Sequence, residues 1–434
     1  MENKLNKISG NLLLRSGTIY DPYINIYKRQ DILIKDNKIV SIKSKIPKKT
    51  NYKIINCKNN IITNGFIDLH AHFREPGFEY KETIVSGSKS AFYGGYTRVC
   101  IMPNTSPVID NHELVKHLIN QSASSPIYIY PIGSITKGQL GLELSEIGQM
   151  VAAGAVAISD DGIPVTNGQI LRMALEYSKK FNIPVINHAE DLSLVNEGLM
   201  HEGINSLKLG LNGNPDISES TMIFRDLSIA DYVGGRIHVP HVSSFKSLEV
   251  IKKFKSKGIN VTSEVTPHHL CLTDNMLLNY NTNAKVAPPL RGEKDRKSLI
   301  KGIKSGIIDC IATDHAPHSI DDKEKDFENA PCGMIGLESS FGLVNKTLKK
   351  EKMDIKSIIN LFTINPSNII NIYPNSIKEG NLAEINIIDP NYSWKFDSKH
   401  IHSLSKNSPI IGHELIGKVL YTINKGLISN YKEN

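Results

Sequence analysis

The sequence has few cysteines, and no two of them lie close together in the sequence. No CxxC motif occurs, and the five cysteines lie far apart, at Cys57, Cys100, Cys271, Cys310 and Cys332. This spacing argues against a disulfide framework and against a zinc site built from thiolates. Any metal ligands are therefore expected to be histidine and aspartate.

Long apolar runs are also absent. No stretch reaches the roughly 20 apolar residues of a membrane-spanning helix, and segment 1–17 lacks an apolar core followed by a small-residue cleavage site. The net charge is +7, but no basic run alternates with aromatic residues as on a nucleic-acid surface. We expect a cytoplasmic protein that acts on a small acidic molecule, without a nucleic-acid or membrane partner.

The composition is that of a globular protein, with 40% hydrophobic and 22% charged residues. Residues 11–63 show short β patterns, and β patterns return near the C-terminus. Between them, eight short apolar segments alternate with helical patterns, from GFIDLHAH to DCIATDHAPH. These patterns predict an α/β protein, with a (β/α)8 TIM-type barrel over 64–377 and a small β-rich domain formed by 1–63 and 378–434.

Most of the predicted strands end in a residue that can bind a metal, as expected where a barrel opens its active site. In GFIDLHAH, strand alternation points both histidines to the same side. Singly, each of these residues could be an ordinary core or surface residue. Together, four histidines and two aspartates at the ends of five strands predict a metal site made of His70, His72, Asp161, His188, His241 and Asp314.

The two aspartates allow different interpretations. Asp161 can bridge two metals while its neighbour Asp160 points away, but the pair could also form an Asx turn before Gly162. Asp314 ends a strongly hydrophobic strand, where an unpaired carboxylate would be costly. We therefore expect Asp314 to be a ligand that also transfers protons.

Other residues near these motifs are expected to bind substrate. Arg74 can hold a carboxylate with two hydrogen bonds, although it could instead pair with Glu75 at the barrel rim. Asn104 offers an amide, and His318 is a third candidate. Residues 319–333 are charged and rich in loop formers, which is typical of either a surface loop or a lid. His268 and His269 are neighbours on a predicted strand and would face opposite ways, so neither is assigned to the site.

The motifs HFREPG, MPNT, SDDG, NHAED, HVSS, EVTPHHL and TDHAPH occur here in the order found in bacterial dihydroorotases, which the chain resembles over roughly residues 10–425. The resemblance implies reversible, zinc-dependent cyclisation of N-carbamoyl-L-aspartate to (S)-dihydroorotate in pyrimidine biosynthesis, with one or two zinc ions. His70 and His72 would bind the first zinc with Asp314. His188 and His241 would bind the second, and Asp161 would bridge the two, as in the aspartate-bridged branch of the amidohydrolase superfamily.

The resemblance also assigns roles to further residues. Asp314 would be the catalytic acid and base, and the substrate would contact His72, Arg74, Asn104, His318, Cys332 and Gly333. One position departs from the family, because Ala287 stands where the motif usually reads NPPLR. A homodimer and a complex with aspartate transcarbamoylase are compatible with the resemblance. The alternatives are an allantoinase or hydantoinase/dihydropyrimidinase, or a non-catalytic dihydroorotase-like partner of aspartate transcarbamoylase, which would usually lack some of the six ligands.

Overall fold

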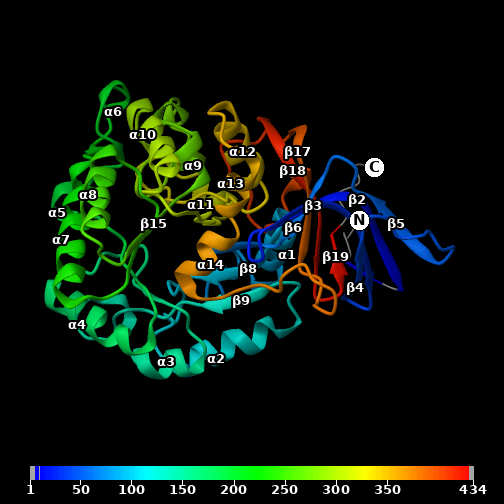
Figure 1. The fold of residues 1–434 in the computed structure, drawn as a ribbon. Helices are drawn as coiled ribbons and strands as arrows, with labels where there is room; N and C mark the ends of the chain where they lie inside the picture. Colours follow the sequence, from blue (N-terminus) through cyan, green and yellow to red (C-terminus); the bar gives the residue numbers. More distant parts are fainter. Residues whose placement is uncertain (1–4, 9, 430–434) are drawn as a thin grey trace.

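The computed structural model describes residues 5–8 and 10–429, so part of the N-terminal segment interpreted above lies outside it. A barrel surrounded by helices occupies one side of the molecule, and a β-sheet built from both ends of the chain occupies the other (Figure 1). None of the helices in these described ranges combines the length and apolar character needed to cross a bilayer.

Eight parallel strands form the barrel. They make two sheets, one of three strands and one of five. Isolated bridges between Gly133 and Ile158 and between Ala71 and His315 close the ring. The strands are β7 (Phe66–Ala71), β8 (Tyr96–Ile101), β9 (Tyr128–Pro131), β10 (Ile158–Ser159), β11 (Val185–Ile186), β14 (Ile237–Val239), β15 (Val261–Val265) and β16 (Cys310–Ile311). All eight predicted strands are confirmed.

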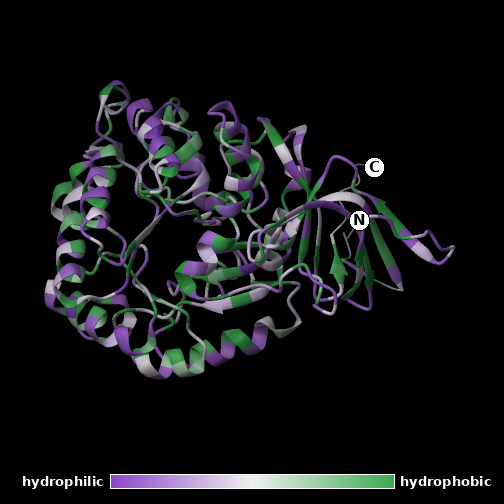
Figure 2. Cartoon of the chain, in the orientation of Figure 1, coloured by the Kyte–Doolittle hydropathy of each residue, from purple (hydrophilic) through white to green (hydrophobic). Residues whose placement is uncertain are grey.

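Helices surround these strands. The helical patterns that alternate with the apolar segments in the sequence include α2 (His112–Gln121), α4 (Gly168–Ser178), α8 (Phe245–Ser256) and α10 (Glu293–Lys304). Figure 2 shows apolar and polar residues alternating along these outer helices, as expected for helices with one buried face. The chain also forms α1 (Ile84–Gly94), α3 (Ile147–Ala153), α7 (Ile217–Val233), α12 (Ser340–Lys350), α13 (Ile355–Asn360) and α14 (Ile364–Ile370).

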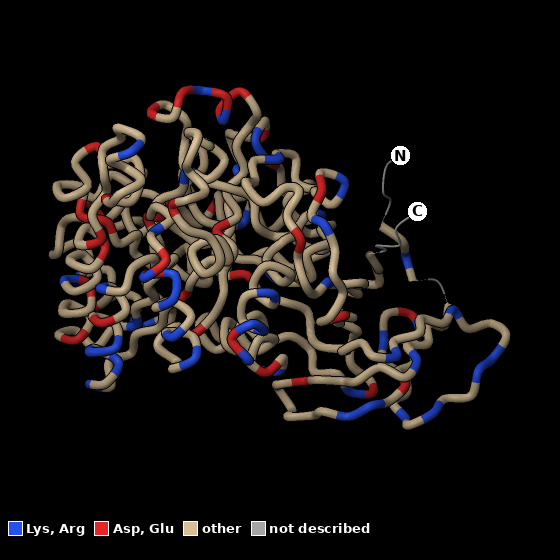
Figure 3. Tube along the Cα trace, turned by 90° about the horizontal axis from the view of Figure 1, so that it is seen from above, with Lys and Arg blue, Asp and Glu red and all other residues tan. Residues whose placement is uncertain are grey.

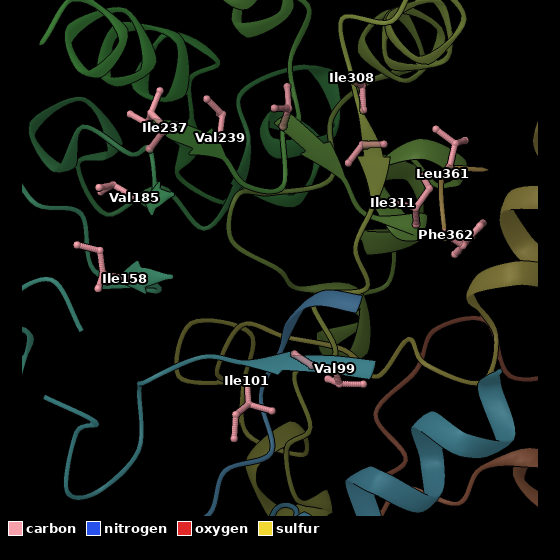
Figure 4. Packing of buried hydrophobic residues seen from close by; sticks show 14 of the residues in the cluster. Val99, Ile101, Ile158, Val185, Ile237, Val239, Ile308, Ile311, Leu361 and Phe362 are labelled. Carbon is pink, nitrogen blue, oxygen red and sulfur yellow. The ribbon is translucent and has the colours of Figure 1, made fainter. Parts of the chain in front are cut away.

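The main hydrophobic core joins strands to helices. Strand residues such as Val99 and Ile237 (Figure 4) belong to the same buried cluster as Leu118 of α2, Leu171 of α4 and Leu227 of α7. Burying a side chain of this size stabilises the fold by about 1.5–3 kcal/mol. This packing makes the strand ends a rigid support for the loops that follow them.

The second sheet unites the two ends of the chain. Its order is β1-β19-β18-β17-β6-β2-β3-β4, with β5 beside β2. β17 lies antiparallel between β6 and β18, with Ile385 opposite both Asn64 and Ile423. The strands are β1 (Asn6–Lys7), β2 (Asn11–Asp21), β3 (Ile26–Lys35), β4 (Lys38–Lys43), β5 (Tyr52–Asn56), β6 (Ile61–Asn64), β17 (Ile385–Lys395), β18 (Glu414–Asn424) and β19 (Leu427–Ile428). The predicted β-rich domain is confirmed.

Two details differ from the expected pattern. The β pattern at the C-terminal end is a hairpin and not one strand, because Lys425 and Gly426 adopt positive φ values of 49° and 74° and turn the chain between β18 and β19. Residues 402–408, between β17 and β18, bond to barrel loops. The domain limits at 63/64 and 377/378 stay a prediction.

Charges of both signs are interspersed over the barrel (Figure 3). The connection between β4 and β5, residues 44–51, is different in charge, because it carries three lysines and no acidic residue. It belongs to the sheet domain, away from the barrel strand ends.

Candidate active site

The six predicted metal ligands meet at the carboxyl ends of the barrel strands. His70 lies on β7, and each of the others closely follows a strand: β7, β10, β11, β14 or β16. All six side chains are buried, with at most 7% of each residue exposed. The fold therefore brings together residues that are up to 244 positions apart.

One half of this cluster surrounds Asp314. Its Oδ1 lies 3.0 Å from His72 Nε2 and 3.5 Å from His70 Nε2. Asp161 faces the same two rings, with Oδ1 3.3 Å from His70 Nε2 and Oδ2 3.5 Å from His72 Nε2. The four residues thus direct two carboxylates and two imidazole nitrogens at a common point.

The other half lies on the far side of Asp161. His241 Nε2 and His188 Nδ1 are 3.6 and 3.9 Å from Asp161 Oδ1 and 3.0 Å from each other. The Asp161 carboxylate therefore faces all four histidines. Its neighbour Asp160 turns away and accepts hydrogen bonds from the amides of Ile135 and Thr136.

The chemistry of these donors fits a metal. His70 Nε2 and Asp161 Oδ1 are buried without a hydrogen-bond partner, which is uncommon for buried polar atoms. One ligand atom from each of His70, Asp161 and His241, or from each of His70, His72 and Asp314, lies within 4.8 Å of the others in its group. Imidazole nitrogens and carboxylate oxygens are typical ligands of zinc and similar divalent ions.

A buried glutamate sets the orientation of His70. Glu264, on β15, accepts a hydrogen bond of 2.9 Å from His70 Nδ1 and another of 3.1 Å from His238 Nε2. Burial alone would raise the pKa of Glu264. The hydrogen bonds and positive charge of these two histidines outweigh burial and lower that pKa to about 2. With its Nδ1 proton held by a carboxylate, His70 presents the Nε2 lone pair to the cluster.

In two other histidines the ring nitrogen that points away from the cluster also has a hydrogen-bond partner. His188 Nε2 is 3.4 Å from Glu190 Oε2, which leaves Nδ1 facing Asp161. His72 Nδ1 donates to Asn104 Oδ1 at 2.9 Å. This bond fixes the orientation of the Asn104 amide, whose Nδ2 donates a long hydrogen bond of 3.4 Å to the Asp161 backbone carbonyl. Sequence reasoning missed Glu190 and Glu264; the signal for Glu264 was a glutamate inside the apolar strand VTSEV.

Glu264→Gln is expected to weaken metal binding by about 10- to 100-fold, the effect typical of partners behind metal ligands. Glutamine lacks the charge that holds the His70 proton. Competition with a chelator measures the affinity, and Glu384→Gln is the control, because Glu384 is equally buried but pairs with Arg98. Equal metal affinity in the Glu264 variant and the wild type would contradict this role.

Five of the six residues, all except His70, line a pocket of about 640 Å³, a volume that includes its opening to solvent. All predicted substrate residues line it: His72, Arg74, Asn104, His318, Cys332 and Gly333. Ala287 lines it too, so the departure from the NPPLR motif lies on the substrate side of the site. The pocket therefore has a metal-binding side and a side available to the substrate.

Arg74 supplies positive charge to the substrate side of the pocket, and His318 lies beside it. Arg74 Nη2 lies 3.4 Å from His318 Nε2, and Arg74 Nε donates to Pro317 O. His318 Nε2 donates to Cys332 O at 2.8 Å, and Lys81 Nζ is 3.3 Å from Nδ1. Burial lowers the pKa of Arg74 to about 10, and burial together with nearby cations lowers that of His318 to about 2. At neutral pH the arginine is charged and the histidine neutral, which suits an anionic group.

Three site residues hold an uncommon backbone conformation. The φ angles of Arg74, His241 and Asp314 are 62°, 32° and 46°. Non-glycine residues in this left-handed region cost on the order of 1–3 kcal/mol each and persist where surrounding structure enforces them. Such strain is common at functional sites, and here it falls on one predicted substrate residue and two predicted ligands.

Segment 319–333 is fastened to the barrel. It contains the short helix α11 (Ile320–Lys323). Lys285 Nζ donates to the carbonyls of Phe327, Glu328 and Ala330, and Lys323 Nζ donates to those of Thr282 and Pro331. The end of this segment thus forms part of the pocket wall.

One expectation about local structure was wrong. His268 and His269 lie on the short helix α9 (Pro267–Cys271), after the end of β15, and not on the strand. Pro267 at the first helical turn and the Thr266 side chain, which caps the His269 amide, start this helix. His269 bonds to Thr266 and to the Pro288 carbonyl, outside the ligand cluster.

Comparisons with known proteins agree with this geometry. Residues 59–247 match the family model described as Dihydro-orotase-like. The dihydroorotase of Ruminiclostridium cellulolyticum is 44% identical over 96% of this chain and 97% of its own length. For that of Citrifermentans bemidjiense, the identity is 41% over 96% and 99%. The chain belongs to the dihydroorotase family. The family predicted from the motifs is thereby confirmed.

Solved structures of other proteins share the fold of this dihydroorotase family member over nearly its whole length. The L-hydantoinase (dihydropyrimidinase) from Arthrobacter aurescens has a TM-score of 0.85 at 22% identity, covering 98% of this chain and 96% of that one. The dihydropyrimidinase from Brevibacillus agri has a TM-score of 0.82 at 19% identity, with 97% and 95% covered. At this identity the likeness concerns the fold alone.

Proposed function

We propose that this enzyme is a dihydroorotase, which reversibly cyclises N-carbamoyl-L-aspartate to (S)-dihydroorotate in pyrimidine biosynthesis. The observation that carries the proposal is a pocket in which five of the six clustered metal-capable side chains, all except His70, face the charged Arg74 and its neighbour His318. Dihydroorotate has both features that such a pocket requires, a carboxylate and a hydrolysable ring amide. Similarity to dihydroorotases over nearly the full chain supports it.

We also propose zinc as the metal, with one or two ions per subunit. His70, His72 and Asp314 would hold one ion, His188 and His241 a second, and Asp161 lies where it would face both. A bound divalent ion supplies a Lewis acid that polarises a carbonyl oxygen and lowers the pKa of water. A homodimer, a complex with aspartate transcarbamoylase and a cytoplasmic location belong to the same proposal.

The roles of the protein groups follow from their positions. Arg74 and His318 would bind the carboxylate, Asn104 would donate its amide to the ring, and the backbone at Cys332 and Gly333 would contact the substrate from the pocket wall. Asp314 would take a proton from the attacking water and return it to the leaving ring nitrogen. Burial raises the pKa of Asp314, but His70 and His72 lower it well below its usual value, so this group begins as a carboxylate able to accept.

The test is ring opening of dihydroorotate, and ring closure of carbamoyl-aspartate, by the zinc-loaded protein, with allantoin and hydantoin as controls. Arg74→Met should raise the KM for dihydroorotate by about 10- to 100-fold, since a hydrogen bond to a charged group contributes about 1.5–3 kcal/mol. Any residual activity on hydantoin, which has no carboxylate, should not differ between this variant and the wild type. Absence of turnover of dihydroorotate despite bound metal would refute the assignment and favour the other cyclic amidohydrolases or a non-catalytic partner.

A further inference from the structure

One segment of the C-terminal domain contacts the loops that surround the active site. This return segment, residues 402–408, lies between β17 and β18. Ser403 Oγ and Leu404 N donate to the carboxylate of Glu82, and Ser405 Oγ donates to Lys81 O at 2.7 Å. Glu82 in turn is 3.3 Å from His315 Nε2, next to Asp314. The return segment is thus tied to the loops that follow β7 and β16.

Asn407 makes the most direct connection. Its side chain is buried, with 4% of the residue exposed. Asn407 Oδ1 accepts from His318 N at 3.1 Å, and Nδ2 donates to Ala316 O and to Gly333 O, both at 3.1 Å. Its carbonyl also accepts from Ile335 N at 3.0 Å. A single amide therefore joins the two chain segments that carry His318 and Gly333.

The bonding pattern requires an amide. One side-chain end must accept from a backbone N–H and donate to two carbonyls at once, which a carboxylate or an aliphatic group cannot do. Each bond ends on the backbone of a residue that itself lines the pocket: Ala316, His318 or Gly333. A shift of this side chain would consequently change the spacing between His318 and Gly333.

We infer that Asn407 is a positioning residue for substrate binding. It holds His318 and the Gly333 backbone at the separation that the carboxylate side of the pocket needs, without itself lining the pocket. The inference rests on the proposed function. It makes the C-terminal domain part of the substrate site and not only a support for the barrel.

The kinetic test compares Asn407→Ala with Asn345→Ala in the full-length, zinc-loaded enzyme. Asn345 is a matched control, since it is 1% exposed and its Nδ2 also donates to two carbonyls, those of Pro390 and Ile416, away from the pocket. Asn407→Ala should raise KM by about 10- to 100-fold with a smaller change in kcat, the scale expected when a binding group is displaced by about 1 Å. Asn345→Ala should leave KM unchanged.

A second variant and a second readout separate positioning from stability. Asn407→Asp keeps the acceptor for His318 N but sets an oxygen against the carbonyls of Ala316 and Gly333, so it should raise KM as alanine does. Hydrogen exchange in peptides covering 315–319 should be faster in both Asn407 variants and unchanged in Asn345→Ala. Exchange remains informative if the wild type does not act on dihydroorotate, which would refute only the proposed function. Wild-type KM and wild-type exchange in Asn407→Ala would overturn the inference.

Discussion

Asp314→Asn is expected to lower kcat for dihydroorotate by about 10²- to 10⁴-fold, the contribution typical of a positioned acid–base group. Asparagine has nearly the same size and keeps an oxygen toward His70 and His72, but its amide cannot take up a proton at neutral pH. The loss should therefore appear in kcat more than in KM. Steady-state kinetics in both directions, with metal content measured on the same samples, test this expectation.

The control for Asp314 is Asp309→Asn. Asp309 directly precedes the N-terminal end of β16, the end opposite to Asp314, and forms an ion pair with Lys255. Its substitution therefore perturbs the same strand at the end far from the pocket. It should leave kcat close to the wild-type value. An Asp314→Asn enzyme that retains metal and turns over within tenfold of the wild type would exclude the acid–base role.

Asp161→Ala is expected to remove metal binding almost completely. Asp161 faces all four histidines of the cluster. The loss of metal affinity in Asp161→Ala should therefore exceed the roughly 10- to 100-fold loss that is typical when a residue hydrogen-bonded to a ligand is replaced. Metal analysis after dialysis and chelator competition measure the loss. The wild type should also melt at a lower temperature once a chelator is added, because a ligand that binds only the folded state stabilises it by about 4 kcal/mol at 1,000 times its Kd.

Asp160→Ala provides the matched comparison. Asp160 is the preceding residue and just as buried, but it accepts from Ile135 and Thr136 and faces away from the cluster. Its loss leaves buried donors unsatisfied, which costs about 1–3 kcal/mol for each group. We expect lower stability with unchanged metal content. Metal loss in Asp160→Ala, or retention in Asp161→Ala, would contradict the assigned ligand set.

The barrel was predictable because its strands carry their own signal. Most of the apolar runs end in a polar residue that can bind a metal, and the parallel arrangement brings those ends to one rim, so His70 and Asp314 meet although each motif is local. The same logic fails for Glu264, which lies within a strand. Its importance comes from a bond to a residue 194 positions away, and no local pattern reports such a pairing.

Asn407 and the lysines that hold segment 319–333 were missed for a related reason. Asn407, Lys285 and Lys323 bond mainly to backbone carbonyls, and any segment of chain offers those. Which carbonyl lies within reach depends on loop conformation, which hydrophobic periodicity does not describe. For His268 and His269, the capping signal of Thr266 and Pro267 was present in the sequence and overrides the strand alternation assumed for them.

The sheet that unites both ends of the chain has a consequence for biosynthesis. Proteins emerge from the ribosome N-terminus first, and their domains generally fold as units in that order. Here β6 can pair with β17 only after the whole barrel has been synthesised, because the residues of β17 follow the barrel in the chain. The pocket likewise cannot be completed before Asn407, which lies only a few residues before β18. Nascent chains truncated before residue 385 should accordingly leave β6 without its partner strand β17 and retain an unfinished pocket, so catalytic competence is one of the last properties this polypeptide acquires during translation.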